Sequence, residues 1–128
     1  MKLLRKEKSA GLVSEGQVVT KATVAAAERL GLSARGLAAV IGVSEASVSR
    51  MKRLEHHLEK GTKPFELALL LIRLFRSLDA ITGGDEGVAK DWMRNPNTML
   101  GGKPAEKIAT VTGLTDVLAY LDARRALI

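Results

Sequence analysis

Residues 65–81 constrain the fold most, because they are apolar on almost every side. Ten of these 17 residues are Leu, Ile or Phe, and Arg73 and Arg76 are the main polar interruptions. A helix of this composition must be buried on most of its surface. The longest unbroken apolar run, residues 67–72, is far too short to span a membrane. The sequence therefore predicts a buried central helix, placed between two smaller units or at a homodimer interface.

The composition indicates an all-α protein that is soluble and cytoplasmic. The 128 residues are 46% hydrophobic but only 3% aromatic, so Ala, Leu, Val and Ile must fill the core of one domain or of two very small ones. The absence of cysteine excludes disulfides, cysteine-ligated zinc and a thiol nucleophile. The N-terminus has charges but no apolar segment behind them, which argues against a signal peptide.

The net charge of +6 lies entirely in the first half of the chain. Residues 1–63 contain twelve Lys and Arg against six Asp and Glu, whereas residues 64–128 contain eight of each kind. This asymmetry favours a polyanion partner for the first half and a different role for the second. We expect a basic flexible arm over residues 1–17, a DNA-binding domain over residues 18–63 and a separate binding or dimerisation domain over residues 64–128.

Residues 33–53 have the pattern of a helix-turn-helix. Ser33 and Ser44 are placed to cap two helices, and Gly42 allows the left-handed backbone of a tight turn between them. The pattern turns six small or apolar side chains inward: Leu37, Ala38, Ile41, Val43, Val48 and Met51.

The second helix of this motif is predicted to present one exposed stripe to the major groove of DNA. Spacing of i, i+3, i+4 and i+7 places four side chains on it, with two more beside them at the start of the helix: Ala46, Ser49, Arg50, Arg53, Ser44 and Glu45. Small and polar residues there can contact base edges, and arginine can reach guanine or phosphate. Glu45 would repel phosphate unless it accepts a hydrogen bond from a cytosine amino group.

Three helices and one loop are expected in the second half. Asp85 caps a helix over residues 86–94, which ends before Pro96. A turn-rich loop leads to a short helix over residues 104–108, and Gly113 separates this from a last helix over residues 115–126. On that last helix Tyr120, Arg124 and Leu127 form a second stripe beside the inward face.

No pattern of an enzyme or a metal site is present. His56 and His57 are adjacent, so they point to different faces of a helix, and we expect both to be exposed. The segment 101–104 lacks the length and the preceding strand of a phosphate-binding loop. We therefore expect a binding protein without cofactors.

The second half resembles the toxin-binding domain of the Xre/MbcA/ParS antitoxin family. The residues that carry the resemblance are Ala89-Lys-Asp-Trp92, Asn95-Pro-Asn97, Met99-Leu-Gly-Gly102, Pro104, Gly113, Val117 and Leu121. The first half resembles the Xre-type helix-turn-helix that accompanies this domain, and together the two cover residues 18–126.

The resemblance implies a type II antitoxin whose partner is a RES-domain toxin, an enzyme that degrades NAD. Members of the family cover the active-site cleft of the toxin and repress their own operon, as dimers or as larger complexes with the toxin. An alternative is a plain dimeric transcription regulator whose second half only dimerises.

For the toxin-binding site we expect a frame and a direct contact. The frame consists of Trp92, which we expect to pack against the 65–81 helix, and of the loop that follows it. The loop residues expected to shape the domain are Asn97, Leu100, Gly101, Gly102 and Lys103. The direct contact is the end of the chain, namely Tyr120, Arg124, Arg125, Leu127 and Ile128.

Overall fold

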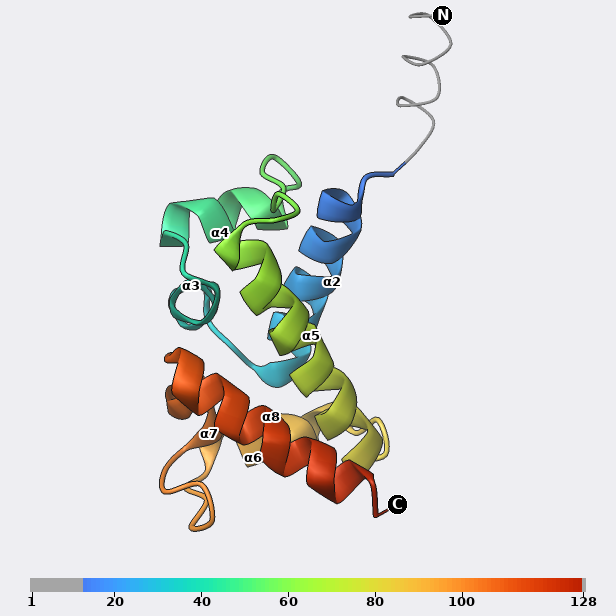
Figure 1. The fold of residues 1–128 in the computed structure, drawn as a ribbon, viewed down its shortest axis with the longest axis vertical. Helices are drawn as coiled ribbons and strands as arrows, with labels where there is room; N and C mark the ends of the chain where they lie inside the picture. The colour runs from blue at the N-terminus through green and yellow to red at the C-terminus, as the bar shows by residue number, and fades with distance from the viewer. Residues whose placement is uncertain (1–12, 128) are drawn as a thin grey trace, which may run out of the picture.

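The computed structural model describes residues 13–127, and within them every regular element is a helix, which confirms the all-α class. The labels follow Figure 1, where the described helices begin with α2. The seven helices are α2 (Glu15–Leu30), α3 (Ala34–Ile41), α4 (Glu45–Lys52), α5 (Lys63–Ile81), α6 (Glu86–Arg94), α7 (Pro104–Lys107) and α8 (Val111–Arg125). No helix among the described residues is long and apolar enough to cross a membrane.

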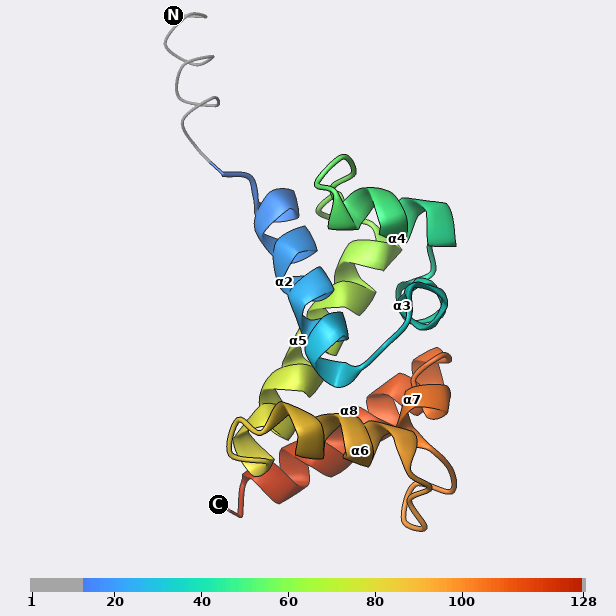
Figure 2. The same ribbon diagram turned by 180° about the vertical axis from the view of Figure 1, so that it is seen from behind.

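Helix α5 is the axis on which the others pack, as its composition predicts. Figures 1 and 2 show α2 beside it, α3 and α4 around its first half, and the layer of α6, α7 and α8 around its second half. Side chains along its whole length are buried: Phe65, Ala68, Leu71, Ile72, Leu74, Ser77 and Leu78. Arg73 and Arg76 are exposed, but so is Leu69, so the helix is not covered on every side.

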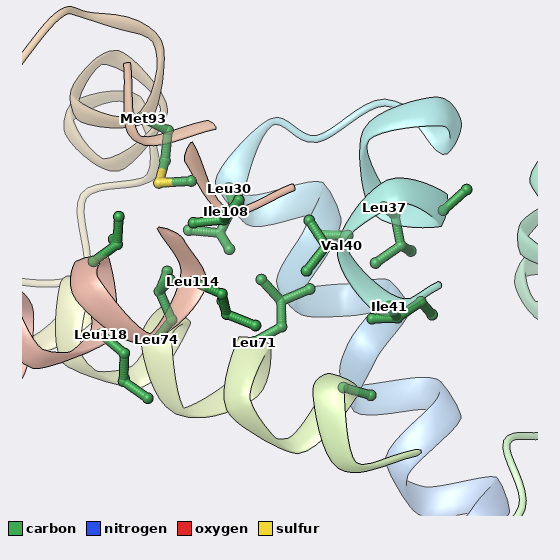
Figure 3. Close-up of a cluster of buried hydrophobic side chains, with 14 of the residues drawn as sticks. Leu30, Leu37, Val40, Ile41, Leu71, Leu74, Met93, Ile108, Leu114 and Leu118 are labelled. Atoms are coloured by element: carbon green, nitrogen blue, oxygen red, sulfur yellow. The ribbon is translucent and has the colours of Figure 1, made fainter. Parts of the chain in front are cut away.

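The two halves of the chain share one hydrophobic core. Figure 3 shows Leu71 and Leu74 of α5 close to Leu30 of α2 and to Ile108 and Leu114 from the last third of the chain. All five side chains are at most 1% exposed. The segments expected over residues 18–63 and 64–128 are therefore packed against each other as one unit.

Side-chain caps fix the starts of six helices. In each, the hydroxyl or carboxylate oxygen of the cap accepts a hydrogen bond from a backbone N–H in the first turn, which satisfies one of its free donors. The caps are Ser14, Ser33, Ser44, Thr62, Asp85 and Thr110.

The first described helix begins within the expected basic arm of residues 1–17. Ser14 and Gln17 form a capping box, in which each side chain accepts a hydrogen bond from the backbone of the other residue, so α2 begins at Glu15. Residues 15–17 therefore belong to the helix. Val13 and the Ser14 cap precede it, and residues 1–12 of the expected basic arm lie outside the described residues.

Gly113 does not separate two helices, contrary to the sequence prediction. It lies in the first turn of α8, which begins at Val111 after the Thr110 cap. A Cβ at position 113 would lie 1.8 Å from the carbonyl oxygen of Lys107. The glycine is thus required for the close approach of α8 to the end of α7.

This contact predicts a large effect of Gly113→Ala on stability. The added methyl would overlap backbone atoms, so α7 and α8 must move apart, at a cost of about 1–3 kcal/mol in the free energy of unfolding. Thermal or urea unfolding measures the difference. Gly87→Ala is the matched control, because Gly87 also lies in the first turn of a helix but a Cβ there meets nothing closer than 3.4 Å. Equal stability of Gly113→Ala and the wild type would contradict the close contact.

Candidate functional site

Helix α4 lies at the end of the molecule farthest from α6, α7 and α8 (Figure 1). Val48 and Met51 are fully buried and hold it against the core. The turn before it is formed as predicted, with Gly42 at φ 73° and with the N–H groups of Gly42 and Val43 both donating to the Ala38 carbonyl. Helices α3 and α4 are therefore a helix-turn-helix.

The inward packing of α4 leaves its predicted stripe exposed. All six residues expected to contact DNA are on the surface: Ser44, Glu45, Ala46, Ser49, Arg50 and Arg53. The carboxylate of Glu45 stabilises α4, because a negative charge in the first turn of a helix interacts favourably with the helix dipole.

The two arginines of the stripe differ in their surroundings. Arg50 donates a hydrogen bond to the Ser47 hydroxyl over 3.1 Å. The hydroxyl is neutral, so this contact does not compensate the positive charge of Arg50. Arg53 is not part of α4, which ends at Lys52, and its Nε lies 3.1 Å from a carboxylate oxygen of Glu55. Both members of this ion pair are more than half exposed, so water weakens it. Of the two arginines, only Arg53 is held in an ion pair among the described residues.

The residue after this pair of arginines has an unusual backbone. Leu54 has φ 61°, which costs a side-chain-bearing residue about 1–2 kcal/mol because its Cβ approaches a carbonyl oxygen. The side chain is 48% exposed. The sequence carries no signal of this feature, because a glycine would be the expected residue at a left-handed helix end.

His56 and His57 are half-buried, whereas the sequence predicted that they are exposed. They follow the end of α4 and line a hollow together with Ser44, Ser47 and Thr62. The loop that carries them is fixed to α2, because the N–H of Leu58 donates a hydrogen bond to the buried Thr20 hydroxyl over 2.9 Å. The described residues contain no cluster of three or more side chains suited to a metal ion.

Trp92 and Tyr120 form an aromatic pair across α6 and α8. Their ring centroids are 6.2 Å apart and their planes differ by 18°, which is a stacked arrangement. The Arg124 guanidinium lies 5.4 Å from the centre of the Tyr120 ring, and it also donates a hydrogen bond to the Tyr120 hydroxyl over 3.2 Å. We call Trp92, Tyr120 and Arg124 the stacked triad.

The stacked triad gives Trp92 a partner that the sequence did not predict. The side chain is partly buried against the hydrophobic core to which α5 contributes, and its aromatic partner is Tyr120 of α8. Trp92 and Tyr120 are both half-buried. Trp92, which the sequence assigned to the frame of the toxin-binding site, and Tyr120, which it assigned to the direct toxin contact, therefore belong to the same surface.

Two exposed apolar side chains extend this region. Val88 lies one helical turn before Trp92 on α6 and is 50% exposed, and Leu127 is 85% exposed at the end of the described chain. Sequence reasoning missed Val88, although its i, i+4 spacing from Trp92 places both on one face of the helix. Arg125 is exposed, and Ile128 lies outside the described residues.

Helix α8 is fixed to α5 through one carboxylate. Asp122 accepts a hydrogen bond from the fully buried Ser77 hydroxyl over 2.8 Å, and it also forms an ion pair with Arg73. Asp122 lies between Tyr120 and Arg124 in the chain, so these bonds join the buried face of α8 in orienting the helix that carries both residues.

The loop between α6 and α7 is held by hydrogen bonds around Asn97. The Asn97 N–H donates to the Gly102 carbonyl, while the Asn97 carbonyl accepts from Gly101 and Gly102 and its side chain accepts from the N–H of Leu100. Gly101 has φ 75°, a conformation that glycine adopts without strain. Met99 is 78% exposed in this loop.

The residues predicted to contact the toxin therefore fall into two groups. Figures 1 and 2 both show the loop after α6 and the C-terminal end of α8 at opposite ends of the α6–α8 layer. The loop group contains Asn97, Leu100, Gly101, Gly102 and Lys103, whereas the other group contains the stacked triad, Arg125 and Leu127.

Comparison with known families gives two adjoining matches. Residues 12–73 match the antitoxin Xre-like helix-turn-helix domain, which contains α3 and α4. Residues 77–126 match the antitoxin Xre/MbcA/ParS C-terminal toxin-binding domain, which contains the stacked triad and the loop. No curated protein is similar enough to the chain to count as a match. The chain belongs to the Xre/MbcA/ParS antitoxin family and combines a helix-turn-helix domain with a toxin-binding domain.

Proposed function

We propose that this protein is a cytoplasmic type II antitoxin that neutralises a RES-domain, NAD-degrading toxin and represses its own operon. The family membership supports the antitoxin role. The observation that carries the proposal is the stacked triad, which holds Trp92, Tyr120 and Arg124 together on the surface of the toxin-binding domain. The protein acts by binding, with no chemical step of its own.

The chemistry of the stacked triad suits a protein partner. Trp, Tyr and Arg are the residue types that contribute most to protein–protein affinity, because each combines a large contact area with a hydrogen-bonding group. Their mutual contacts restrict their motion before binding, so less conformational entropy is lost on association. The apolar Val88 and Leu127 beside them add area that is still exposed to water.

In the proposed complex the stacked triad and the end of the chain cover the active-site cleft of the toxin. Leu127 can fill an apolar part of the cleft, and the arginines can pair with acidic groups there. The loop around Asn97 lies at the other end of the layer from the end of α8 and forms a separate part of the interface.

On the DNA side, α4 enters the major groove of the operator. Ala46, Ser49 and Arg50 contact base edges, whereas Arg53 contacts phosphate. Helix-turn-helix proteins bind as dimers to half-sites about 34 Å apart, and we propose the same for this chain.

The position of the two surfaces allows both partners to bind at once. Helix α4 and the α6–α8 layer lie at opposite ends of α5 (Figure 1). A toxin bound over the stacked triad therefore leaves α4 free for DNA, which is consistent with repression by a larger toxin–antitoxin complex.

Replacing Tyr120 with Ala tests the toxin surface. The change removes the partner of both Trp92 and Arg124, so we expect the dissociation constant for the toxin to rise about 30-fold or more, as for a central interface residue. Co-purification with the RES-domain toxin and the NAD content of the producing cells are the two measurements.

Val111→Ala is the control for this experiment. Val111 is a 61% exposed apolar residue at the other end of α8, so its removal should leave neutralisation unchanged. A Tyr120→Ala protein that still binds the toxin and preserves NAD as the wild type does would contradict the proposed interface.

Replacing Arg50 with Ala tests the DNA surface. If Arg50 contacts a base, binding to the DNA upstream of the gene should weaken by about 1–3 kcal/mol, with less effect on an unrelated duplex. Fluorescence anisotropy on both duplexes at fixed salt measures this. An equal loss on both would show that Arg50 contacts only phosphate, and no loss on either would argue against α4 as the recognition helix.

A further inference from the structure

Leu54 is the one non-glycine residue with a left-handed backbone in the part of the chain that the structure describes. It lies two residues after the end of α4, in the turn that leads away from the proposed recognition helix. Its φ of 61° and its exposed fraction of 48% both require a physical reason.

The turn itself does not need a leucine. The N–H of Glu55 donates to the Arg50 carbonyl over 2.8 Å, and the N–H of Leu54 donates to the Met51 carbonyl over 3.0 Å. These two bonds form the Schellman motif that ends many helices, and its left-handed position is usually glycine. Glycine would make the same hydrogen bonds without the steric conflict of a Cβ.

The hydrophobic core does not need the side chain either. Leu54 is absent from the buried cluster and from the partly buried residues packed against it, although Met51 and Leu58 on either side of it are buried. A strained residue whose side chain is half exposed and lies outside the core contributes little to folding. Backbone strain of this kind clusters at functional sites such as those that hold a ligand.

The surroundings of Leu54 fit DNA. Three exposed cations precede it, namely Arg50, Lys52 and Arg53, and the exposed stripe of α4 ends beside it. Cations suit the phosphates at the edge of a DNA groove, whereas an apolar side chain suits thymine methyl groups and the carbon atoms of deoxyribose. The carboxylate of Glu55 is held by Arg53 and so is partly compensated.

We propose that Leu54 is an additional DNA-contacting residue, which packs against thymine methyl or deoxyribose carbons at the end of the recognition helix. The inference rests on the proposed DNA-binding function. It gives the left-handed leucine a function, because its half-exposed apolar side chain would meet DNA next to the cation of Arg53.

The experiment compares Leu54→Gly, Leu54→Ala and Leu54→Met in the full chain. The probe is the duplex upstream of the gene, with a shuffled duplex as reference. Glycine and alanine both remove the side chain, so each should weaken binding by about three- to tenfold, since only the exposed half of one leucine is left to bury. Methionine keeps a flexible apolar side chain and should bind as the wild type does.

Stability and salt dependence separate this effect from a folding defect. Leu54→Gly should unfold at a higher temperature than Leu54→Ala, because only alanine keeps the left-handed strain, yet both should lose the same affinity. Their salt dependence should match the wild type, whereas Arg53→Ala should reduce the slope by about one unit if it removes a phosphate contact. Leu69→Ala removes another exposed leucine, from α5, and should leave DNA affinity unchanged.

Three results would overturn the inference. Wild-type affinity in both Leu54→Gly and Leu54→Ala would show that the side chain does not touch DNA. A loss in glycine but not in alanine would assign the effect to the backbone. If the wild type binds neither duplex, the proposed DNA-binding function itself is wrong. That outcome is distinct from a failure of the Leu54 inference alone, because in the latter case the wild type binds DNA and Arg50→Ala weakens this binding.

Discussion

The burial of α5 is the interaction on which the rest of the structure depends. Its apolar side chains contact α2 and α3 on one half and α8 on the other, so a single helix supplies the core of both halves. Because α5 is rigid over its 19 residues, it also sets the distance and direction between α4 and the α6–α8 layer. The two proposed binding surfaces are therefore held apart by the same contacts that stabilise the fold.

Each surface is ordered by bonds within the protein before any partner is present. The Thr20 hydroxyl holds the loop that follows α4, and the buried Ser77 hydroxyl holds Asp122 next to the stacked triad. An ordered surface loses less entropy on binding, which favours affinity at a small interface. Leu54 shows the opposite arrangement, in which a residue with an unfavourable backbone conformation lies beside the proposed DNA-binding surface.

The sequence predicts features that depend on local spacing. The apolar run gives α5, the caps give the helix starts, and the register of Leu37, Gly42 and Val48 gives the helix-turn-helix. Features that depend on distant partners are missed. In the sequence Gly113 resembles the end of a helix, and only the structure shows that the Lys107 carbonyl leaves no room for a side chain there. The stacking partner of Trp92 cannot be found from local spacing, because Tyr120 lies 28 positions later in the chain. The early start of α2 is different, since the Ser14–Gln17 capping box is local and could have been recognised.

The central claim is that the chain binds and neutralises a toxin through its last helices. It is tested most directly by producing the protein with and without the product of the neighbouring gene, and by measuring the size of the complex and the NAD content of the cells. The account predicts a stoichiometric complex, NAD preserved by the full chain, and NAD lost when the chain is truncated after Ala123, which removes Arg124 and Leu127. A truncated chain that still preserves NAD, or a full chain that purifies without a partner, would contradict it.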